Sequence, residues 1–437
     1  MISNLSTVML NAMRSHNAII VILVLLGEVL LVVMAWRSPW IIALTVFLQL
    51  FFFWAGTKST SIAKLLRRFH EPSFPWNELT PPYVARVQAF AKTLLEDPSI
   101  EATEFGFRGA SFRRAGANSA AVNGWENACL LNGYRTALRY APQDNDIEII
   151  ERFCGRIIDP KGRFKTDPKT VDQCMIGEAL LDLFEKTQKD AYRSSVATLA
   201  EVLMKVHART SSGTLPYRKT SPQIVLVDAI PMVSPFLVRY GNMFQSSEAV
   251  ELGVHQCREF LQCGLEYGTN LPYHGYYVGR PGGLGAVAWG RGCGWFALGL
   301  SGVLTYLSPQ TEHHQYLLEG FRKVVRSMCD YQLKGGGWAW CLPFTSPRAE
   351  TSATATIACG IQRGIDIGAL DGSYADTVQG AIRALVAATD AQGVVTGGHG
   401  VSLGAGTRPL NVWFSRWTQG CTMALATMLT HSGEGVR

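Results

Sequence analysis

The sequence carries little charge for its length and lacks the motifs of several common enzyme classes. Asp, Glu, Lys and Arg make up 17% of its 437 residues, whereas hydrophobic residues make up 47%. It contains no GxxxxGK[ST] phosphate-binding loop, no HExxH zinc motif and no Cys-x-x-Cys pair. The missing motifs argue against P-loop nucleotide hydrolases and zinc peptidases, and we expect no metal site.

The ten cysteines show no disulfide framework. They are scattered through the chain, and most lie in apolar stretches with helical periodicity. Their positions are 129, 154, 174, 257, 263, 293, 329, 341, 359 and 421. Free thiols buried in a reducing compartment explain this pattern better than disulfides or zinc ligands do.

Almost all of the net positive charge belongs to the first 70 residues. They contain six basic residues and one acidic residue, so the rest of the chain holds 34 of the 40 basic and 33 of the 34 acidic residues. Proteins that bind nucleic acids usually present a strongly basic surface. The nearly neutral remainder therefore argues against a nucleic-acid partner.

Two apolar runs near the N-terminus predict a membrane hairpin. Residues 18–36 contain one charge, Glu28, and residues 40–56 contain none, so each run approaches the roughly 20 residues that span a bilayer. A short polar turn, Arg37-Ser-Pro39, lies between them. The alternative is a cleaved signal peptide, whose apolar core would be about 7–15 residues long and would not be followed by a second apolar run.

The basic residues around the two runs predict the orientation of the hairpin. Arg14 precedes the first run, and four basic residues follow the second within 58–68. Basic residues favour the cytoplasmic side, so we expect both ends of the hairpin in the cytoplasm and its apolar runs in the lipid of the inner membrane. The alternative places the large domain on the periplasmic face. The chain then divides into a membrane anchor (1–57), a basic and proline-rich linker (58–82) and a large domain (83–437).

Beyond residue 83, apolar residues recur at three- and four-residue spacing, which predicts helices. We expect twelve, near 83–96, 125–140, 145–156, 171–187, 190–207, 223–240, 246–264, 288–307, 311–333, 350–369, 373–389 and 411–431. Short extended pieces are expected only at 103–113 and 393–402. Six helix pairs that cannot bury their faces alone must stack or close into a ring. We predict an all-α (α/α)6 barrel over an open solenoid, because no fixed sequence period is visible.

Unusual residues fall at the start of every second predicted helix. These positions hold Trp125, Asn127, Asp172, Asp228, the segment Trp289–Trp295, Glu350, Thr351 and Trp413. In a barrel of helix pairs, every second helix belongs to the inner ring, and the N-termini of the inner helices share one end. We therefore expect these residues to line one pocket, where free N–H groups at helix N-termini favour an anionic ligand.

The segment Trp289-Gly-Arg-Gly-Cys-Gly-Trp295 combines groups suited to an acidic sugar. A tryptophan ring offers a flat face for a sugar ring, and the guanidinium of Arg291 matches a carboxylate. The three glycines let a ligand approach the backbone closely. The alternative is a packing corner, a role that Gly- and Trp-rich segments also serve.

Asp172 and Asp228 are the candidate catalytic acids. Two carboxyl groups at a sugar pocket suit proton transfer at a glycosidic centre. Asp228 lies in the nearly continuous apolar run Ile224–Val233, where a carboxylate is costly unless it is partnered or functional. For Asp172 the alternative is an N-cap of the following helix, since Asp is a preferred capping residue.

Three further polar residues are candidate substrate contacts. His274 lies in a loop rich in aromatic residues and glycine, where a surface histidine is the alternative. Arg218 and Lys219 precede Asp228 by ten and nine residues, and either side chain could hold a substrate carboxylate. Solvated loop charge is the alternative for both.

Three other positions also have structural alternatives. Glu350 and Thr351 are candidate substrate contacts, but they also fit a helix start in which Thr or Ser supplies the cap. His399 lies in Gly397-Gly-His-Gly400, which fits either a loop tip or a lid over the site.

Several ordered motifs resemble glycoside hydrolase families 88 and 105, the unsaturated glucuronyl and unsaturated rhamnogalacturonyl hydrolases. The matching segments are Asp172–Gly177, Val227–Gly241, Tyr273–Gly275, Trp289–Trp295 and Glu350–Ala355. The fourth resembles the family's WGRGNGW segment, and the first two resemble the segments that carry its two aspartates. The resemblance covers about residues 83–430 and implies an (α/α)6 barrel.

The resemblance also implies a reaction. The substrate would be an acidic oligosaccharide whose terminal uronic acid has a C4=C5 double bond. Asp228 would protonate C4 and activate the water that adds at C5, and the resulting hemiketal would collapse and release the rest of the sugar. Asp172 would position sugar hydroxyls and water. No metal or organic cofactor would be needed.

The implied sugar contacts come from the aromatic and polar residues of the pocket. Trp125, Trp289 and Trp295 would stack the sugar ring, while Arg291 and His274 would contact its polar groups. The sequence departs from the family pattern at three places, which bear on substrate identity. They are Cys293 for the asparagine of WGRGNGW, Tyr217 for a histidine upstream of the catalytic aspartate, and Tyr276-Tyr277 after Tyr-His-Gly.

Two other functions fit the sequence. One is a catalytically silent module that binds glycan or partners a membrane protein of polysaccharide synthesis. Glu28 and Gln49 inside the apolar runs favour such a partner, because polar groups in lipid seek contacts. The other is a hydrolase of saturated or lipid-linked uronides. The presence of both Asp172 and Asp228 favours an enzyme.

Overall fold

The structure is a computed structural model, and it describes residues 75–98, 100–103, 111–114, 124–143, 145–346, 348–401 and 412–431. All of them belong to one structural unit of the chain, which spans 72–105 and 110–437. For 101–103, 111–114, 412 and 413, only the backbone is described. The statements below concern these residues.

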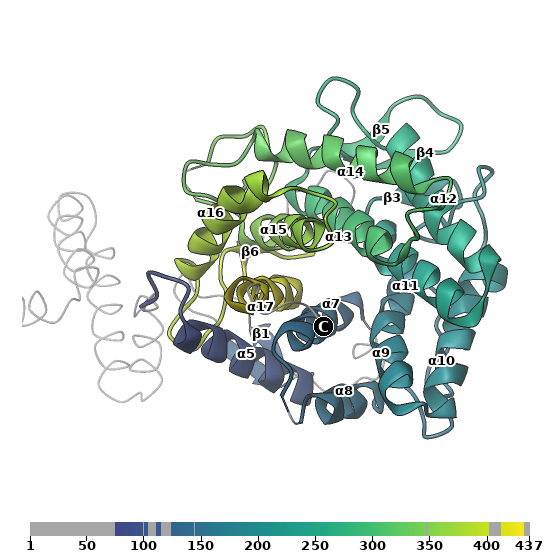
Figure 1. The fold of residues 1–437 in the computed structure, drawn as a ribbon, viewed down its shortest axis with the longest axis horizontal. Coiled ribbons are helices and arrows are strands. Elements are labelled where there is room, and N and C mark those ends of the chain that lie inside the picture. The colour runs from purple at the N-terminus through teal and green to yellow at the C-terminus, as the bar shows by residue number, and fades with distance from the viewer. Residues whose placement is uncertain are drawn as a thin grey trace, which may run out of the picture. The chain divides into compact units, whose positions relative to one another are not determined.

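The twelve α-helices of the described residues form two concentric layers (Figure 1). The inner layer contains α7 (Trp125–Tyr140), α9 (Gly177–Thr187), α11 (Ala229–Phe244), α13 (Gly290–Tyr306), α15 (Thr351–Asp366) and α17 (Arg416–His431). The outer layer contains α5 (Pro81–Glu96), α8 (Asp146–Cys154), α10 (Asp190–Glu201), α12 (Ser247–Cys263), α14 (His314–Cys329) and α16 (Ala375–Val386). Outer and inner helices alternate along the chain, which confirms the predicted all-α barrel of helix pairs.

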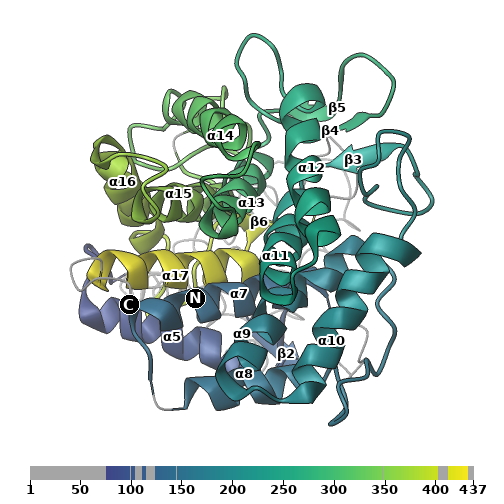
Figure 2. The same cartoon turned by 45° about the vertical axis from the view of Figure 1, so that its right-hand side comes forward.

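The inner helices close into a ring. Each inner helix contacts the next one along the chain, in the order α7, α9, α11, α13, α15 and α17, and α17 in turn contacts α7. Figures 1 and 2 both show α17 beside α7, although the two helices lie at opposite ends of the described sequence. Because the last helix packs on the first, the open solenoid is excluded.

The burial of each layer explains its sequence pattern. Outer helix α14 buries one stripe, made by Leu317, Phe321, Val324, Val325 and Met328. Inner helix α13 is instead buried almost all round, because it packs against α11, α14 and α15. A helix with one apolar stripe covers a core, and a helix that is apolar all round lies inside it.

Glycines allow neighbouring inner helices to approach closely. A Cβ added at Gly133 of α7 would lie 2.2 Å from the carbonyl oxygen of Gly420 in α17. A Cβ added at Gly294 of α13 would lie 1.9 Å from Oγ1 of Thr356 in α15. Both distances are far inside van der Waals contact, so a larger residue would force these helix pairs apart.

Three small antiparallel sheets accompany the helices. β1 (Ile100–Thr103) pairs with β2 (Ser111–Arg114), and β6 (Gly398–His399) pairs with β7 (Val412–Trp413). The third contains β3 (Ile224–Leu226), β4 (Tyr273–Tyr277) and β5 (Gly283–Val287), which Figure 2 shows beside α12. β2 and β6 agree with the extended pieces expected at 103–113 and 393–402, whereas β7 lies where the helix 411–431 was predicted, and that helix begins only at Arg416.

The predicted helix at 223–240 is wrong in its first part. Residues 224–226 form β3, and the helix begins only at Ala229. Ile224, Val225 and Leu226 pair with Tyr277, Tyr276 and Gly275 of β4. The apolar run continues through strand and helix without a break, so its composition could not separate them, and β4 supplies the deciding hydrogen bonds from about fifty residues away.

The membrane prediction concerns residues that the structure does not describe. Both apolar runs, 18–36 and 40–56, lie outside the described residues. Among the helices that are described, none is long and apolar enough to cross a bilayer. Each of the ten cysteines is a free thiol, and eight of them are buried.

A network of ion pairs joins three inner helices away from their N-termini. Arg135 of α7 donates two hydrogen bonds to the carboxylate of Asp182 in α9, one of them at 2.8 Å from Nη2. Arg239 of α11 lies 2.6 Å from the same carboxylate. Burial raises the pKa of Asp182, but the charges and hydrogen bonds of the arginines lower it by more, so its pKa lies well below its usual range.

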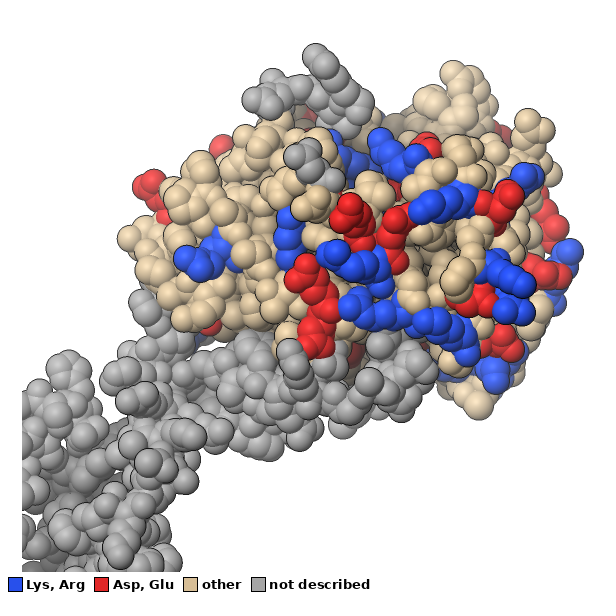
Figure 3. Space-filling view, turned by 90° about the horizontal axis from the view of Figure 1, so that it is seen from below, with Lys and Arg blue, Asp and Glu red and all other residues tan. Residues whose placement is uncertain are grey.

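The outer surface mixes charges of both signs. Figure 3 shows Lys and Arg interspersed with Asp and Glu on the face seen from below. Ion pairs join neighbouring outer elements, such as Arg152 with Glu96 at 3.3 Å and Lys189 with Glu151 at 2.6 Å. This face therefore presents no continuous basic surface to a polyanion.

We predict that Gly133→Ala lowers the free energy of unfolding by about 1–3 kcal/mol, because the added methyl group overlaps the α17 backbone. Urea unfolding measures the change. The control is Gly335→Ala, since a Cβ at Gly335 meets no atom within 4 Å. Equal unfolding midpoints for the two variants would contradict the close packing of α7 and α17.

We predict that Asp182→Asn lowers the free energy of unfolding at pH 7 by about 3–5 kcal/mol, because it removes the carboxylate that two buried arginines share and leaves their positive charge under-compensated. The folded-state pKa is depressed, so the stabilisation is present above pH ~4 and is lost as the pH falls below it. The difference between wild type and variant should therefore shrink below pH ~4 in urea unfolding. Asp167→Asn, at an exposed position, is the control. A difference that does not change with pH would count against this ion network.

Candidate active site

The N-termini of the inner helices bring together the residues that the sequence singles out. Trp125 begins α7, and Asp228, Trp289 and Glu350 occupy the N-cap positions of α11, α13 and α15. Asp172 lies in the 3₁₀ turn Val171–Ile176 that leads into α9. Because outer helices return the chain between inner ones, the inner N-termini share one end of the barrel, and the contacts below join them.

Asp228 faces a histidine. Its carboxylate makes no capping hydrogen bond to α11, although it stands at the N-cap position. Instead Oδ2 lies 3.3 Å from Nε2 of His274, with only 14% and 8% of the two side chains exposed. The sheet sets this geometry, because the N–H of Val227 donates to the carbonyl of His274 across β3 and β4 at 2.9 Å. A carboxyl group beside an imidazole can give and take protons in a largely dry site.

Asp172 pairs with an arginine and does not cap its helix. Arg218 Nη1 and Nη2 lie 3.0 and 3.1 Å from Oδ1 and Oδ2 of Asp172. The N-cap position of the 3₁₀ turn belongs to Thr170. The capping alternative for Asp172 is therefore wrong, and its two oxygens face a guanidinium in the loop that precedes β3.

The aromatic residues form a packed wall with one accessible member. Trp125 is half-buried and stacks on Trp417 with ring centroids 4.6 Å apart. Trp289 and Trp295 are only 4% and 1% exposed. The ring of Trp289 packs against His274, with ring centroids 4.4 Å apart. The ring of Trp295 meets the edge of Trp125, with centroids 6.0 Å apart, and borders a cavity of about 60 Å³. Protein atoms thus surround Trp289 and Trp295, and Trp125 is the more accessible of these rings.

Arg291 is tied to the protein and does not extend into open space. Its guanidinium lies between the rings of Trp289 and Trp417, 4.7 and 5.0 Å from their centroids. Nη1 donates to the carbonyl of His399 at 2.8 Å, and both Nη atoms donate to the carbonyl of Gly400 at 3.1 Å. Burial lowers its pKa, while Glu350 and Asp228 act in the opposite direction. The side chain anchors the loop around His399 at the edge of the site.

Glu350 anchors the same loop from its other side. The carboxylate caps α15 by accepting hydrogen bonds from the N–H groups of Ser352 and Ala353, and it also accepts the N–H of His399 at 2.7 Å. Burial raises the pKa of Glu350, but the hydrogen bond and charge of His399 and the charge of Arg291 lower it by more, so the net shift is downward. The capping alternative is correct, except that Glu350 itself is the cap.

The remaining predicted contacts occupy different environments. Thr351 is buried, and its hydroxyl donates to the carbonyl of Thr396 at 2.7 Å, so it also holds the loop. Asn127 is buried in the first turn of α7. Lys219 is exposed on the loop beside Arg218. The side chain of Trp413 lies outside the described residues.

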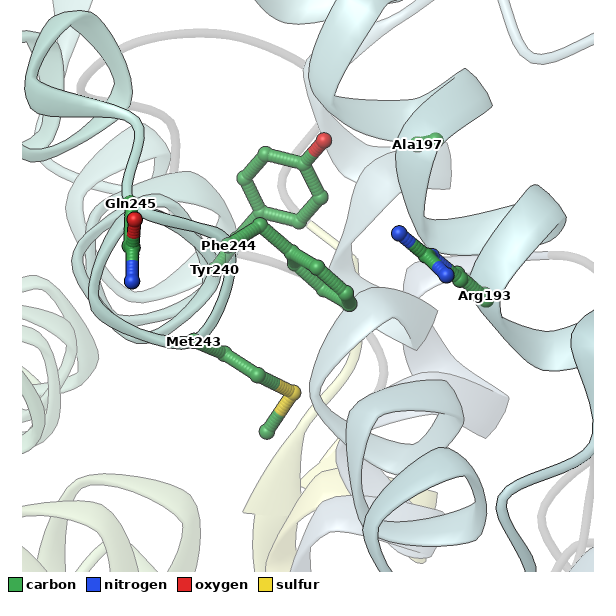
Figure 4. A pocket seen from close by; sticks show the side chains of 6 residues that line it. All are labelled: Arg193, Ala197, Tyr240, Met243, Phe244 and Gln245. Carbon is green, nitrogen blue, oxygen red and sulfur yellow. The ribbon is translucent and has the colours of Figure 1, made fainter.

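No group of three or more His, Cys, Asp or Glu residues suited to a metal ion occurs in the described part of the chain. A larger cavity exists elsewhere, between α10 and α11, with a volume of about 410 Å³. Figure 4 shows its lining, which includes Arg193, Tyr240 and Phe244. It adjoins the C-terminal end of α11, about 24 Å along this helix from Asp228, and so takes no part in the site.

The family model of Glycosyl Hydrolase Family 88 matches residues 110–430, which include every element of the site. The chain belongs to this family. Its members are glycoside hydrolases, and the match covers all six inner helices. The family membership confirms the resemblance seen in the sequence motifs.

Known proteins of related sequence and fold agree with this assignment. The unsaturated rhamnogalacturonyl hydrolase YesR of Bacillus subtilis is 25% identical over 277 residues, which cover 62% of this chain and 78% of that protein. A possible family 105 member from Salmonella enterica has a TM-score of 0.69 at 19% identity, over 80% of this chain and 94% of that one. The unsaturated glucuronyl hydrolase of Bacillus sp. GL1 has a TM-score of 0.63 at 17% identity, over 79% and 95%. At these identities the two structures establish the fold alone.

Two departures from the family pattern have different consequences in this family 88 chain. Cys293 is fully buried behind the site, where burial raises the pKa of its thiol. It therefore fills the core and does not face a sugar, so it gives no information on the substrate. Tyr217 is half-buried inside the site, where burial and the charges of Asp228 and Asp172 raise the pKa of its hydroxyl.

Two residues of the site were not predicted as contacts. Tyr217 was noticed only as a departure from the family pattern, and Trp340, whose ring lies 6.3 Å from that of His399, was not singled out. Nothing local in the sequence marks either. Trp340 follows Gly335-Gly-Gly337, a loop-like segment whose place beside the site depends on the pairing of Trp289 with Cys341.

We predict that Glu350→Gln lowers the free energy of unfolding by about 2–4 kcal/mol, because an amide offers one acceptor oxygen to several buried N–H donors. Catalytic activity should fall with it, since the loop around His399 loses an anchor. Urea unfolding and initial rates measure the two effects. Glu312→Gln, at an exposed position, is the control. A variant as stable as wild type would rule out this role for the carboxylate.

Proposed function

We propose that this chain hydrolyses acidic oligosaccharides that end in an unsaturated uronic acid, that Asp228 carries the proton transfers and that His274 stabilises its carboxylate. Family membership and the relatives named for unsaturated rhamnogalacturonyl and unsaturated glucuronyl substrates support the substrate class. The observation that supports the roles is the 3.3 Å contact between His274 and Asp228, whose side chains are only 8% and 14% exposed.

The reaction begins on the C4=C5 double bond. Asp228, in its protonated form, donates a proton to C4, and the ring oxygen stabilises the positive charge that develops at C5. A water molecule adds at C5 and returns a proton to Asp228, so the carboxyl group ends in its starting form. His274, at 3.3 Å, stabilises the carboxylate that exists between the two transfers.

The remaining steps follow from the hemiketal formed at C5. Its hydroxyl group becomes a ketone as the bond from C5 to the ring oxygen breaks, which leaves a hemiacetal at C1. That hemiacetal collapses to an aldehyde and releases the rest of the oligosaccharide as an alcohol. One water is consumed, and no bond at the anomeric carbon is displaced directly. Trp125 offers its ring to the sugar, and Asp172 accepts hydrogen bonds from its hydroxyl groups.

Asp228→Asn should lower kcat by about 100- to 10,000-fold, because an amide cannot donate a proton to C4. The assay follows the ultraviolet absorbance of the enol ether of an unsaturated uronyl disaccharide. Asp190→Asn, at the exposed start of α10, is the control and should keep wild-type activity. Equal activity of Asp228→Asn and wild type would remove Asp228 from this role, and inactivity of wild type would reject the substrate class.

The proposal includes a membrane tether at residues 18–36 and 40–56, with the hydrolase domain on the cytoplasmic side. Its support is the length of the two apolar runs and the basic residues that flank them. A domain on that side would meet saturated or lipid-linked uronides of polysaccharide synthesis, and these sugars form the second set of substrates to assay. A reporter fused to the C-terminus tests the orientation, and a signal from outside the cytoplasm would reverse it.

A further inference from the structure

Arg218 is fixed in place on three sides. Its two Nη atoms bond the two oxygens of Asp172 at 3.0 and 3.1 Å, and Nη1 also donates to the carbonyl of Tyr217 at 3.1 Å. Its guanidinium carbon lies 4.1 Å from the centroid of the Tyr217 ring, so the planar group stacks on the ring. A guanidinium held by two parallel bonds and a stacked ring has little freedom to turn toward a ligand.

The loop that carries Arg218 is attached to the strand that leads to Asp228. The N–H of Tyr217 donates to the carbonyl of Ile224 in β3 at 3.2 Å. Within the loop, the N–H of Ser221 donates to the carbonyl of Arg218 at 3.0 Å. β3 ends two residues before Asp228, so a single rigid element sets the positions of Arg218 and the catalytic aspartate.

The pairing gives the two aspartates different surroundings. Asp172 faces a permanently charged guanidinium, and its own charge helps to raise the pKa of the Tyr217 hydroxyl and of the Cys174 thiol. Asp228 faces His274, which can gain and lose a proton. A carboxylate beside a fixed cation suits a constant role in orientation, whereas one beside an imidazole suits proton transfer.

We infer that Arg218, seated on Tyr217, is a positioning residue that holds the Asp172 carboxylate in the orientation needed to accept hydrogen bonds from the sugar. The inference rests on the proposed function and replaces the prediction that Arg218 holds the substrate carboxylate. The side-chain exposures agree, because Arg218 is 41% exposed and Asp172 only 14%, so the carboxylate is the more buried partner of the pair.

A double-mutant cycle tests whether Arg218 acts through Asp172. Arg218→Ala and Asp172→Asn should each lower kcat by about 10- to 100-fold with little change in KM, because each loses the fixed orientation of one carboxylate. In the Asp172→Asn background, Arg218→Ala should add less than about 3-fold, since its partner is already gone. Arg218→Lys should recover part of the loss, because an ammonium group keeps the charge but not the two parallel bonds.

Arg280→Ala provides a matched control. Arg280 also stacks on a tyrosine, with its guanidinium carbon 5.0 Å from the Tyr277 ring centroid, but it is exposed in the turn between β4 and β5. Its removal should leave kcat and KM within about 2-fold of wild type, because it takes away a stacked surface cation and leaves Asp172 untouched.

The substrate distinguishes this role from binding of the uronate. An unsaturated disaccharide and its methyl ester differ only in the carboxylate, and Arg218→Ala should slow both by the same factor. A rise in KM confined to the free acid would overturn the inference, as would losses from Arg218→Ala and Asp172→Asn that multiply in the double variant. Arg218→Lys serves the same comparison should Arg218→Ala fail to fold.

The outcome for the proposed function is read separately. If wild type consumes neither substrate, the proposed reaction is rejected. Calorimetry then measures the dissociation constant of the saturated uronyl disaccharide for each protein of the double-mutant cycle. Coupled effects of Arg218 and Asp172 on that constant would support the inference without turnover. Independent effects would reject it.

Discussion

The inner ring closes because glycines let neighbouring helices pack closely: Gly133 packs on the backbone of Gly420, and Gly294 leaves room for the side chain of Thr356. This close approach sets the spacing of α7 from α17 and of α13 from α15. Asp172, Asp228 and the tryptophans meet only because six chain reversals bring inner helices back in the same direction. The site is therefore a consequence of ring closure, and a change that widens one helix pair would displace groups that belong to other helices.

Buried charge serves two purposes in this barrel. Away from the site, Asp182 neutralises arginines on neighbouring helices. At the site, Arg291 and Glu350 bond the carbonyl and the N–H of His399 and so hold one loop from both sides. Because their hydrogen bonds end on protein atoms, these residues stabilise the surroundings of the site. The Asp228 carboxylate differs in that it caps nothing and faces a histidine that can change its charge.

Helical periodicity predicted the barrel and the end at which the site lies, because every second helix start carried unusual residues such as Trp125 and Asp228. It could not predict hydrogen-bond partners, which depend on residues far away in the sequence. From the sequence, Arg291 could equally bind a sugar carboxylate, but in the fold its guanidinium donates to the carbonyl of Gly400. Cys293 suggested a changed substrate, but its side chain is fully buried. The sheet of β3, β4 and β5 was missed for the same reason, since its strands gain their hydrogen bonds only from one another.

The most direct measurement is the position of solvent hydrogen in the product. Turnover of an unsaturated uronyl disaccharide in D₂O, followed by proton NMR, reports where the new C–H bond forms. If Asp228 protonates the double bond, one deuterium per turnover appears at C4 of the released keto acid, and Asp228→Asn forms this product far more slowly. Release of the second sugar with the C4=C5 double bond still present and no deuterium at C4 would contradict this chemistry, because it would mean displacement at the anomeric carbon.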